Sequence, residues 1–406
     1  MGTFKGIACG ASRQKGLHFG GMLTRLCRLP RGRSCLLLGP RQTGKSTLVR
    51  SLLPRRAWSV DLLQQDVFLR YSKDPARFRL EVEAKLKSGT RVVFVDEIQR
   101  VPALLQEIHG LIEARGVRFL LTGSSARKLR RGAANLLAGR AATRRLYPLT
   151  RIEQGRHFEL ERTLRYGSLP AAVTGSAAAA RDLLASYAET YLREEVQAEA
   201  LVRNLGGFAR FLDVVAAENG GIVNASAVAR DAALATRTVQ EYYQILEDTL
   251  IGYRLEAWRA SPRARLVGHP RFYLFDTGVT NALVGRLGAA PDPAWRGRLF
   301  EQWVVLECLR LTDYGRTEAR LYYWRTHNGA EVDLLIERHG RLRLAAEVKA
   351  KTRVASADLS GLRSFAEAHP GVRRVVVSEV PEPYAIAGVE VLPYRTFFDR
   401  LSRWLR

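Results

Sequence analysis

Eight residues near the N-terminal end of the chain have the types and spacing needed to hold the phosphates of a nucleotide. In the motif GxxxxGK[ST], glycines let backbone N–H groups wrap around phosphates, a lysine reaches the β- and γ-phosphates, and a hydroxyl ligates Mg²⁺. Here a threonine follows the motif, and we predict that the nine residues bind ATP and Mg²⁺, with Lys45 also catalytic and Ser46 a metal ligand. The nine are Gly39, Pro40, Arg41, Gln42, Thr43, Gly44, Lys45, Ser46 and Thr47.

The residues on either side of this motif predict the elements that must position it. Residues 35–38 form a short apolar run, as in buried parallel strands. Residues 47–53 are expected to form a helix, which Pro54 ends. Because a phosphate-binding loop of this type lies between a strand and a helix, this context favours a true site over a chance match.

A second apolar run supplies the acids that phosphoryl transfer requires. Residues 91–95 are expected to form a strand with Asp96 and Glu97 at its carboxyl end. The chemistry needs one carboxylate to hold the metal and one group to activate water. We predict that Asp96 ligates Mg²⁺ and that Glu97 is the catalytic base. The alternative, in which both acids cap the next helix, leaves the preceding apolar run unexplained.

A third expected strand, residues 117–121, ends in polar residues that could sense the γ-phosphate. Thr122 and Ser124 are both candidates, and either hydroxyl would also serve to cap a helix. Ser124 is counted among the nucleotide-binding residues, while the choice between the two stays open.

Seven cations and no acid lie between residues 127 and 145. This cluster has three possible interpretations: a solvated surface, a loop that faces DNA, or an arginine finger inserted into the ATP site of a neighbouring subunit. Arg140 is the candidate finger. The DNA-facing reading rests on Arg127, Lys128, Arg130 and Arg131.

These motifs together resemble a bacterial and archaeal family of ATPases in the AAA superfamily, whose members carry a C-terminal domain of unknown function. The resemblance rests on residues 38–46, 95–99, 121–125, 135–140 and 147–149, and covers nearly all of the chain from about Leu23. It implies an AAA-type ATPase core over residues 23–160 and assembly into a ring, with a hexamer favoured. It does not supply a substrate. Residues 1–22 are expected to be an extension, with Met22 a candidate start.

The middle of the chain predicts a helical linker or lid over residues 161–203 and a winged helix over residues 204–264. Helices are expected at 208–218, 225–231 and 237–248, capped by Asn224 and Thr236 where the last two begin, and a strand at 250–258. The last helix would present Arg237 and Gln240 to duplex DNA, with Arg263 and Arg265 near the wing. Winged helices also bind proteins, and the acids on this helix keep that alternative open.

Residues 265–406 contain three ionisable residues that resemble the PD-(D/E)XK nuclease pattern. Strands expected around Asp333 and around Glu347 and Lys349 would bring these side chains together, with Glu301 from a nearby helix. Nuclease chemistry uses two carboxylates to hold Mg²⁺ and a lysine to polarise the attacking water. The alternatives are a surface cluster of two acids and a lysine, or a DNA-binding remnant that does not cut.

Composition sets the broad class. The chain has 406 residues and a net charge of +24, mostly from arginine, which favours polyanionic partners, although an arginine-rich genome would have the same effect. No apolar run approaches the roughly 18 residues that span a bilayer, and no signal peptide is recognisable, so we expect a cytoplasmic protein with no membrane partner. Four cysteines fit no zinc site, and Cys35 is expected to be a small buried residue.

The sequence therefore predicts an α/β chain with an AAA-type P-loop ATPase domain, a helical and winged-helix middle domain, and a restriction-endonuclease-like α/β C-terminal domain. The leading hypothesis is a ring-forming ATPase, with ATP and Mg²⁺ as cofactors, that binds duplex or branched DNA such as a Holliday junction and remodels or translocates on it. One alternative is an ATP-gated, Mg²⁺-dependent DNA nuclease in defence. Another is a signalling ATPase with a protein-binding winged helix.

Overall fold

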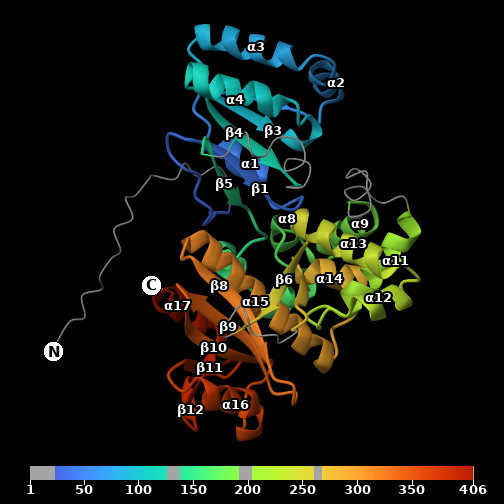
Figure 1. Cartoon of the computed structure of the whole chain (residues 1–406), viewed down its shortest axis with the longest axis vertical. Helices are drawn as coiled ribbons and strands as arrows, with labels where there is room; N and C mark the ends of the chain where they lie inside the picture. The colour runs from blue at the N-terminus through green and yellow to red at the C-terminus, as the bar shows by residue number, and fades with distance from the viewer. Residues whose placement is uncertain (1–22, 126–136, 138, 192–203, 260–267, 406) are drawn as a thin grey trace, which may run out of the picture.

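The computed structural model describes residues 23–125, 137, 139–191, 204–259 and 268–405. These residues form a mixed α/β chain in three parts. The N-terminal part, which the sequence predicts to be an ATPase domain and which is called the ATPase part below, lies at one end, and the middle and C-terminal parts lie side by side beneath it (Figure 1).

The ATPase part is built on a parallel sheet of five described strands, in the order β2-β3-β4-β1-β5. Every residue of β1 and β3 is buried, as expected for a parallel sheet covered on both faces. The strands are β1 (Ser34–Leu38), β2 (Trp58–Asp61), β3 (Val92–Asp96), β4 (Arg118–Gly123) and β5 (Ala141–Arg145). The expected strands before the P-loop and before Asp96 are confirmed.

Two apolar clusters cover the two faces of this sheet. On one face, Val49 of α1 packs with Leu37 and Phe94, and Tyr314 from the C-terminal part joins them. On the other face, α3 and α4 pack against Val93 and Val95. The helices are α1 (Lys45–Ser51), α2 (Gln65–Lys73), α3 (Pro75–Lys87), the short η1 (Ile98–Arg100) and α4 (Leu104–Arg115). The buried thiol of Cys35, 1% exposed, confirms its expected role as a core residue.

The middle part is mostly helical and has one core. Tyr166, Leu184 and Tyr187 pack in the same cluster as Phe208 and Tyr242. The segment expected to be a separate linker or lid therefore shares its core with the helices that follow it. The described helices are α6 (Arg151–Gln154), η3 (Gly155–His157), α7 (Leu160–Tyr166), α8 (Pro170–Thr174), α9 (Ala177–Ser186), η4 (Tyr187–Tyr191), α11 (Leu205–Ala217), α12 (Ala225–Asp231), α13 (Thr236–Asp248) and α14 (Thr277–Leu283).

Helices α11 to α13 follow the predicted order, and a hairpin completes the arrangement. Asn224 caps α12, as expected, because its side chain accepts a hydrogen bond from the Ala227 N–H at 3.0 Å. Strand β6 (Gly252–Ala257) pairs antiparallel with β7 (Arg271–Leu274), and Ile222 bridges to Arg271. Since β7 and α14 pack in the middle core, this part extends beyond the predicted boundary at residue 264.

The C-terminal part continues from this hairpin as a mixed sheet. Among the described residues its order is β12-β13-β11-β10-β9-β8-β6-β7. Helices α15 and α17 cover one face and α16 covers the other. The elements are α15 (Pro293–Gly315), β8 (Ala319–Arg325), β9 (Glu331–Arg338), β10 (Arg341–Lys349), η5 (Ser356–Leu359), α16 (Ser360–Ala368), β11 (Arg373–Ser378), β12 (Tyr384–Ile386), β13 (Val389–Pro393) and α17 (Tyr394–Trp404).

Side-chain alternation in β9 departs from a simple two-residue period. Strict alternation along this strand would place Val332, Leu334 and Ile336 on one face. In the structure Leu334 and Ile336 pack beneath α15, whereas Val332 packs with the α16 cluster. The pairing of β8 with β9 shifts register between Tyr322 and Trp324, and such an irregularity turns a neighbouring side chain to the other face.

Among the described residues, no helix combines the length and apolarity required to cross a bilayer.

One glycine marks a close contact between α14 and the rest of the middle part. A Cβ on Gly278 would lie 2.4 Å from the backbone carbon and oxygen of Tyr166, whereas a Cβ on Gly288 would meet nothing within 4 Å. We therefore expect Gly278→Ala to lower the free energy of unfolding by about 1–3 kcal/mol, because neither backbone can give way cheaply. Urea denaturation checks this, with Gly288→Ala as control. Equal midpoints for the two variants would contradict it.

Candidate functional site

The P-loop is held closely between strands of the ATPase sheet. The Gly39 N–H donates to the Gly123 carbonyl at 3.2 Å, and a Cβ on Gly39 would lie 2.2 Å from the Leu146 carbonyl oxygen. Lys45 Nζ donates to the carbonyls of Gly39 and Pro40 at 2.9 and 3.0 Å. Lys45 is thus folded over the loop, where its ammonium group lies beside the backbone that would wrap the phosphates.

Ser46 and Asp96 form the candidate Mg²⁺ site. Ser46 Oγ donates to Asp96 Oδ1 at 2.8 Å, and Thr122 Oγ1 donates to the same carboxylate oxygen. Two neighbouring oxygen ligands of an octahedral Mg²⁺, each about 2.1 Å from the ion, lie about 3 Å apart, so this pair fits the ion. Burial raises the pKa of Asp96, and the hydrogen bonds from Thr122 and Ser46 oppose that rise. Bound Mg²⁺ would supply positive charge against the phosphates.

Glu97 is held over the P-loop by a short chain of polar side chains. Its backbone has φ 58° and ψ 48°, a left-handed conformation that costs a non-glycine residue about 1–3 kcal/mol. Its N–H donates to Thr122 Oγ1 at 3.1 Å, and its carboxylate lies 3.9 Å from Lys45 Nζ. Gln99 Nε2 donates both to Glu97 and to Ser124 Oγ, the latter at 2.9 Å. Thr122 therefore contacts both acids directly, and Ser124 reaches Glu97 through Gln99.

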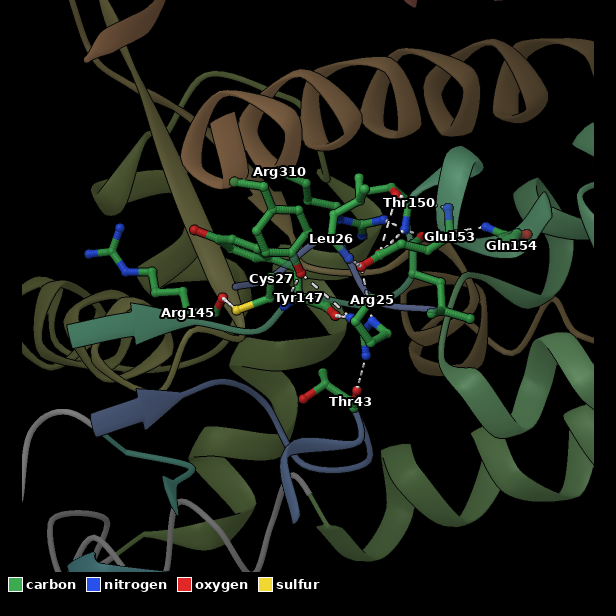
Figure 2. Close-up of polar contacts among 12 residues, drawn as sticks. Arg25, Leu26, Cys27, Thr43, Arg145, Tyr147, Thr150, Glu153, Gln154 and Arg310 are labelled. Carbon is green, nitrogen blue, oxygen red and sulfur yellow. Dashed lines mark hydrogen bonds and ion pairs between the residues drawn. The ribbon is translucent and has the colours of Figure 1, made fainter. Parts of the chain in front are cut away.

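Arg25, which the sequence reading did not single out, joins the P-loop to the rest of the chain (Figure 2). Its guanidinium donates to the Thr43 carbonyl and to the Tyr147 carbonyl, both at 2.6 Å. It also pairs with Glu153 at 3.0 Å, where the two side chains are 7% and 0% exposed. A buried pair of this kind needs its remaining atoms to be hydrogen-bonded.

Glu153 meets that condition through backbone donors. Its carboxylate accepts from the Leu26 N–H at 2.6 Å and from the Thr150 N–H at 2.8 Å, which completes a capping box at the start of α6. The Tyr147 N–H in turn donates to the Tyr314 hydroxyl at 3.0 Å, near the end of α15. One contiguous network therefore connects the P-loop, the end of β5, α6 and α15.

The candidate arginine finger lies away from the P-loop of its own chain. Arg140 directly precedes Ala141, which pairs with Ser34 at the start of β1, whereas the P-loop follows the end of β1. Arg140 forms an ion pair with Glu113 of α4. It is therefore not part of the site in its own chain. The DNA-binding candidates Arg127, Lys128, Arg130, Arg131, Arg263 and Arg265 lie outside the described residues.

The candidate recognition helix α13 exposes the predicted side chains. The side chain of Arg237 is 91% exposed and forms an ion pair at 3.5 Å with Glu241, and Gln240 is exposed. The opposite face buries Val239 and Tyr242 in the middle core. The helix thus presents a mixed polar face of both charges to solvent.

The four nuclease-like candidates lie close together, but an arginine lies among them. The Arg271 guanidinium donates to Glu301 at 2.7 Å and to Asp333 at 3.4 Å, and it also pairs with Glu331. Lys349 Nζ lies 2.7 Å from Glu347. Burial raises the pKa of both Glu301 and Glu347, and the charge of Asp333 raises both further.

These residues do not fit a divalent metal as they stand. Each carboxylate of the cluster already faces a cationic side chain, and the Asp333 oxygen not facing Arg271 accepts from the Val348 N–H at 2.9 Å. No group of three acidic, histidine or cysteine side chains suited to a metal occurs in the described part of the chain. The arrangement is a buried ion-pair network centred on Arg271, a residue that precedes both expected strands in sequence.

Comparisons with known families agree with the division into three parts. Residues 31–154 match an AAA domain, which is consistent with the parallel sheet and its P-loop. Residues 157–290 match a domain of unknown function (DUF8612), and residues 296–397 match another (DUF4143). The chain thus contains an AAA domain, a match that suggests ATPase activity, followed by regions catalogued without a function.

Its curated relatives are uncharacterized proteins. Those of Mycobacterium bovis and Mycobacterium tuberculosis are 29% identical over 319 residues, which is 75% of this chain and 68% of theirs. One from Haemophilus influenzae is 22% identical over 316 residues, or 70% of this chain and 77% of its own. The solved structure of Can2 from Sulfobacillus thermosulfidooxidans in complex with cyclic tetra-adenylate covers 92% of this chain and all of its own, at 10% identity. The TM-score of 0.22 is too low to indicate a shared fold.

Glu97 provides a test of the hydrolytic site. We expect Glu97→Gln to bind ATP as the parent does but to hydrolyse it about 10²–10⁴-fold more slowly, because a base that accepts the proton of water is lost. Steady-state ATP turnover and binding of a fluorescent ATP analogue measure the two effects. Asp66→Asn, which removes an exposed acid of α2, is the control. Unchanged turnover in Glu97→Gln would remove the residue from this role.

Arg25 provides a second test, of positioning rather than catalysis. Arg25→Met leaves Glu153 buried without its cation and should lower the free energy of unfolding by about 3–5 kcal/mol. In Arg25→Met/Glu153→Gln the buried charge is removed and most of that stability should return. ATP affinity should nevertheless stay about tenfold weaker, since the charged hydrogen bond to Thr43 is lost. Urea midpoints and nucleotide titrations separate the two effects, and full recovery of ATP affinity in the double variant would show a purely structural role.

Proposed function

We propose that this chain is a Mg²⁺-dependent ATPase that works on DNA as a ring-shaped homo-oligomer, with a hexamer favoured. The observation that carries the hydrolytic part is the arrangement of Ser46, Asp96 and Glu97 around Lys45. In it a metal ligand pair, a base and a phosphate-binding lysine meet at the carboxyl ends of β1 and β3, which lie on either side of β4 in the sheet. Phosphoryl transfer requires these roles in this proximity.

In the proposed reaction each residue has a defined task. The P-loop backbone and Lys45 hold the phosphates, and Ser46 and Asp96 hold the metal. Glu97 accepts a proton from the attacking water, and Gln99 orients its carboxylate. In the proposed ring, Arg140, which pairs with Glu113 in its own chain, would complete the nucleotide site of a neighbouring subunit.

DNA is the proposed partner because of charge and helix placement. The chain has a net charge of +24, and α13 presents Arg237 and Gln240 to solvent beside a hairpin, the layout in which a winged helix reads duplex DNA. Duplex and branched DNA, including four-way junctions, are the proposed substrates for remodelling or translocation. The buried cation of Arg271 does not favour a metal-dependent nuclease activity.

Turnover in the presence of DNA tests this proposal. We expect duplex, forked or four-way DNA to stimulate ATP hydrolysis, and Arg237→Ala/Gln240→Ala to weaken DNA binding by about tenfold without changing turnover in the absence of DNA. Arg156→Ala, which removes an exposed cation elsewhere in the middle part, is the control. Binding should fall steeply with salt, because phosphate contacts release counterions.

Two outcomes would contradict the proposal. If none of these DNAs binds at low salt, or if all leave turnover unchanged, DNA is not the partner. ATP-dependent assembly with no effect on DNA affinity would instead support a signalling ATPase whose helices bind a protein.

A further inference from the structure

A cavity of about 630 Å³ lies between the ATPase part and the C-terminal sheet. Its origin is a split in that sheet. Strands β6 and β8 pair only through Glu256 with Tyr322 and Ala257 with Tyr323, so their earlier residues separate. The space between them is closed by α15 on one side and by β5 of the ATPase sheet on another. Its volume is within the usual range for sites that take small ligands or single nucleotides.

The walls of this cavity carry an excess of positive charge. Five arginines line it, against two acids, Asp313 and Glu318. Arg254 pairs with Glu247, and Glu318 pairs with His339. Three of the arginines, Arg144, Arg316 and Arg320, form no ion pair within the described part of the chain. Cations gathered at a recess without an acid to pair with favour an anionic ligand, and phosphate groups suit arginine best.

The interior of the cavity is apolar and aromatic. Leu255, Leu306 and Leu309 line it together with Tyr147, Tyr253 and Tyr322. The Tyr253 hydroxyl is enclosed and makes no hydrogen bond to any described residue. An apolar recess with one unsatisfied hydroxyl matches a planar, hydrogen-bonding ring such as a base, because such an atom loses stability until it is paired.

The wall next to the ATPase sheet is connected to the P-loop by backbone contacts. Arg145 and Tyr147 line the cavity, and Leu146 between them donates to the Leu38 carbonyl at 2.7 Å and packs its own carbonyl against Gly39. The Tyr147 carbonyl accepts from Arg25, which also holds Thr43. In Figure 2 the side chain of Arg145 points away from this network, so one segment faces both sites.

We propose that this cavity receives one nucleotide of a single nucleic-acid strand, with its phosphate toward Arg144, Arg316 and Arg320 and its base against the tyrosines. Filling the cavity fixes the segment from Arg145 to Tyr147, and through it the position of the P-loop. This inference rests on the proposed function, since it gives a DNA-directed ATPase the place at which a strand is sensed. It concerns a site separate from α13.

Binding of a fluorescein-labelled thymidine oligomer of about 16 nucleotides to the full-length protein tests the inference. We expect Arg316→Gln/Arg320→Gln to weaken binding by about tenfold. The slope of log K against log salt should fall by about 0.7, because about 0.7 is lost for each phosphate of a single strand that is no longer neutralised, and the cavity holds one. Arg156→Gln/Arg181→Gln removes the same charge from exposed positions outside the cavity and should bind as the parent does.

A filling variant tests the base pocket without changing charge. Leu309→Trp should weaken binding of the oligomer, and the oligomer should no longer change the ATP turnover of this variant. Parental strand binding in both cavity variants, or equal loss in the control pair, would overturn the inference. So would binding of thymidine monophosphate without binding of the oligomer.

If duplex and four-way DNA still stimulate these variants while strand binding is unchanged, the cavity inference fails and the proposed function stands. If no DNA stimulates the parent, the proposed function itself fails.

Discussion

The buried pair of Arg25 and Glu153 is the interaction on which the arrangement of the three parts depends. A single guanidinium, placed before the first strand, bonds to the P-loop, to the end of β5 and to the carboxylate that begins α6. Because both charges are buried, each is tolerated only while the other and the surrounding backbone donors remain in place. A P-loop held in this way cannot shift alone, since a displacement of Thr43 breaks contacts shared with the middle and C-terminal parts.

The nucleotide site was largely predictable because its chemistry is local in sequence. Gly39 to Ser46 is contiguous, and Asp96 and Glu97 follow a strand whose burial is evident from its apolar residues. A residue such as Arg25 was not predictable, because nothing near it in sequence distinguishes it from the other arginines of this chain. Its partners Tyr147, Glu153 and Tyr314 are more than 100 positions away. Only the closed fold brings them together.

The C-terminal cluster also shows that a partner distant in sequence limits what can be predicted. Alternation along the strands correctly suggested that Asp333, Glu347 and Lys349 approach one another near Glu301. Their charges were then interpreted as a metal site. Arg271 changes that interpretation, because it enters from β7, a strand that pairs at the far edge of the sheet. The number of carboxylates alone therefore did not predict the net charge of this cluster. The pairing shift in β8 similarly moved Val332 to the face that simple alternation did not assign.

Helix α15 extends from the network around the P-loop along one face of the C-terminal sheet. Its 23 residues make a rod about 35 Å long, with Tyr314 beside the P-loop network at one end and Arg296, paired with Glu161 and Glu379, near the other. A rigid rod of that length that pivots by about 5° at the Tyr314 end carries its other end through about 3 Å. Helix α15 therefore connects the P-loop network with the ion pairs of Arg296, and a rotation of that size about its Tyr314 end would move the Arg296 end by about the size of a side chain.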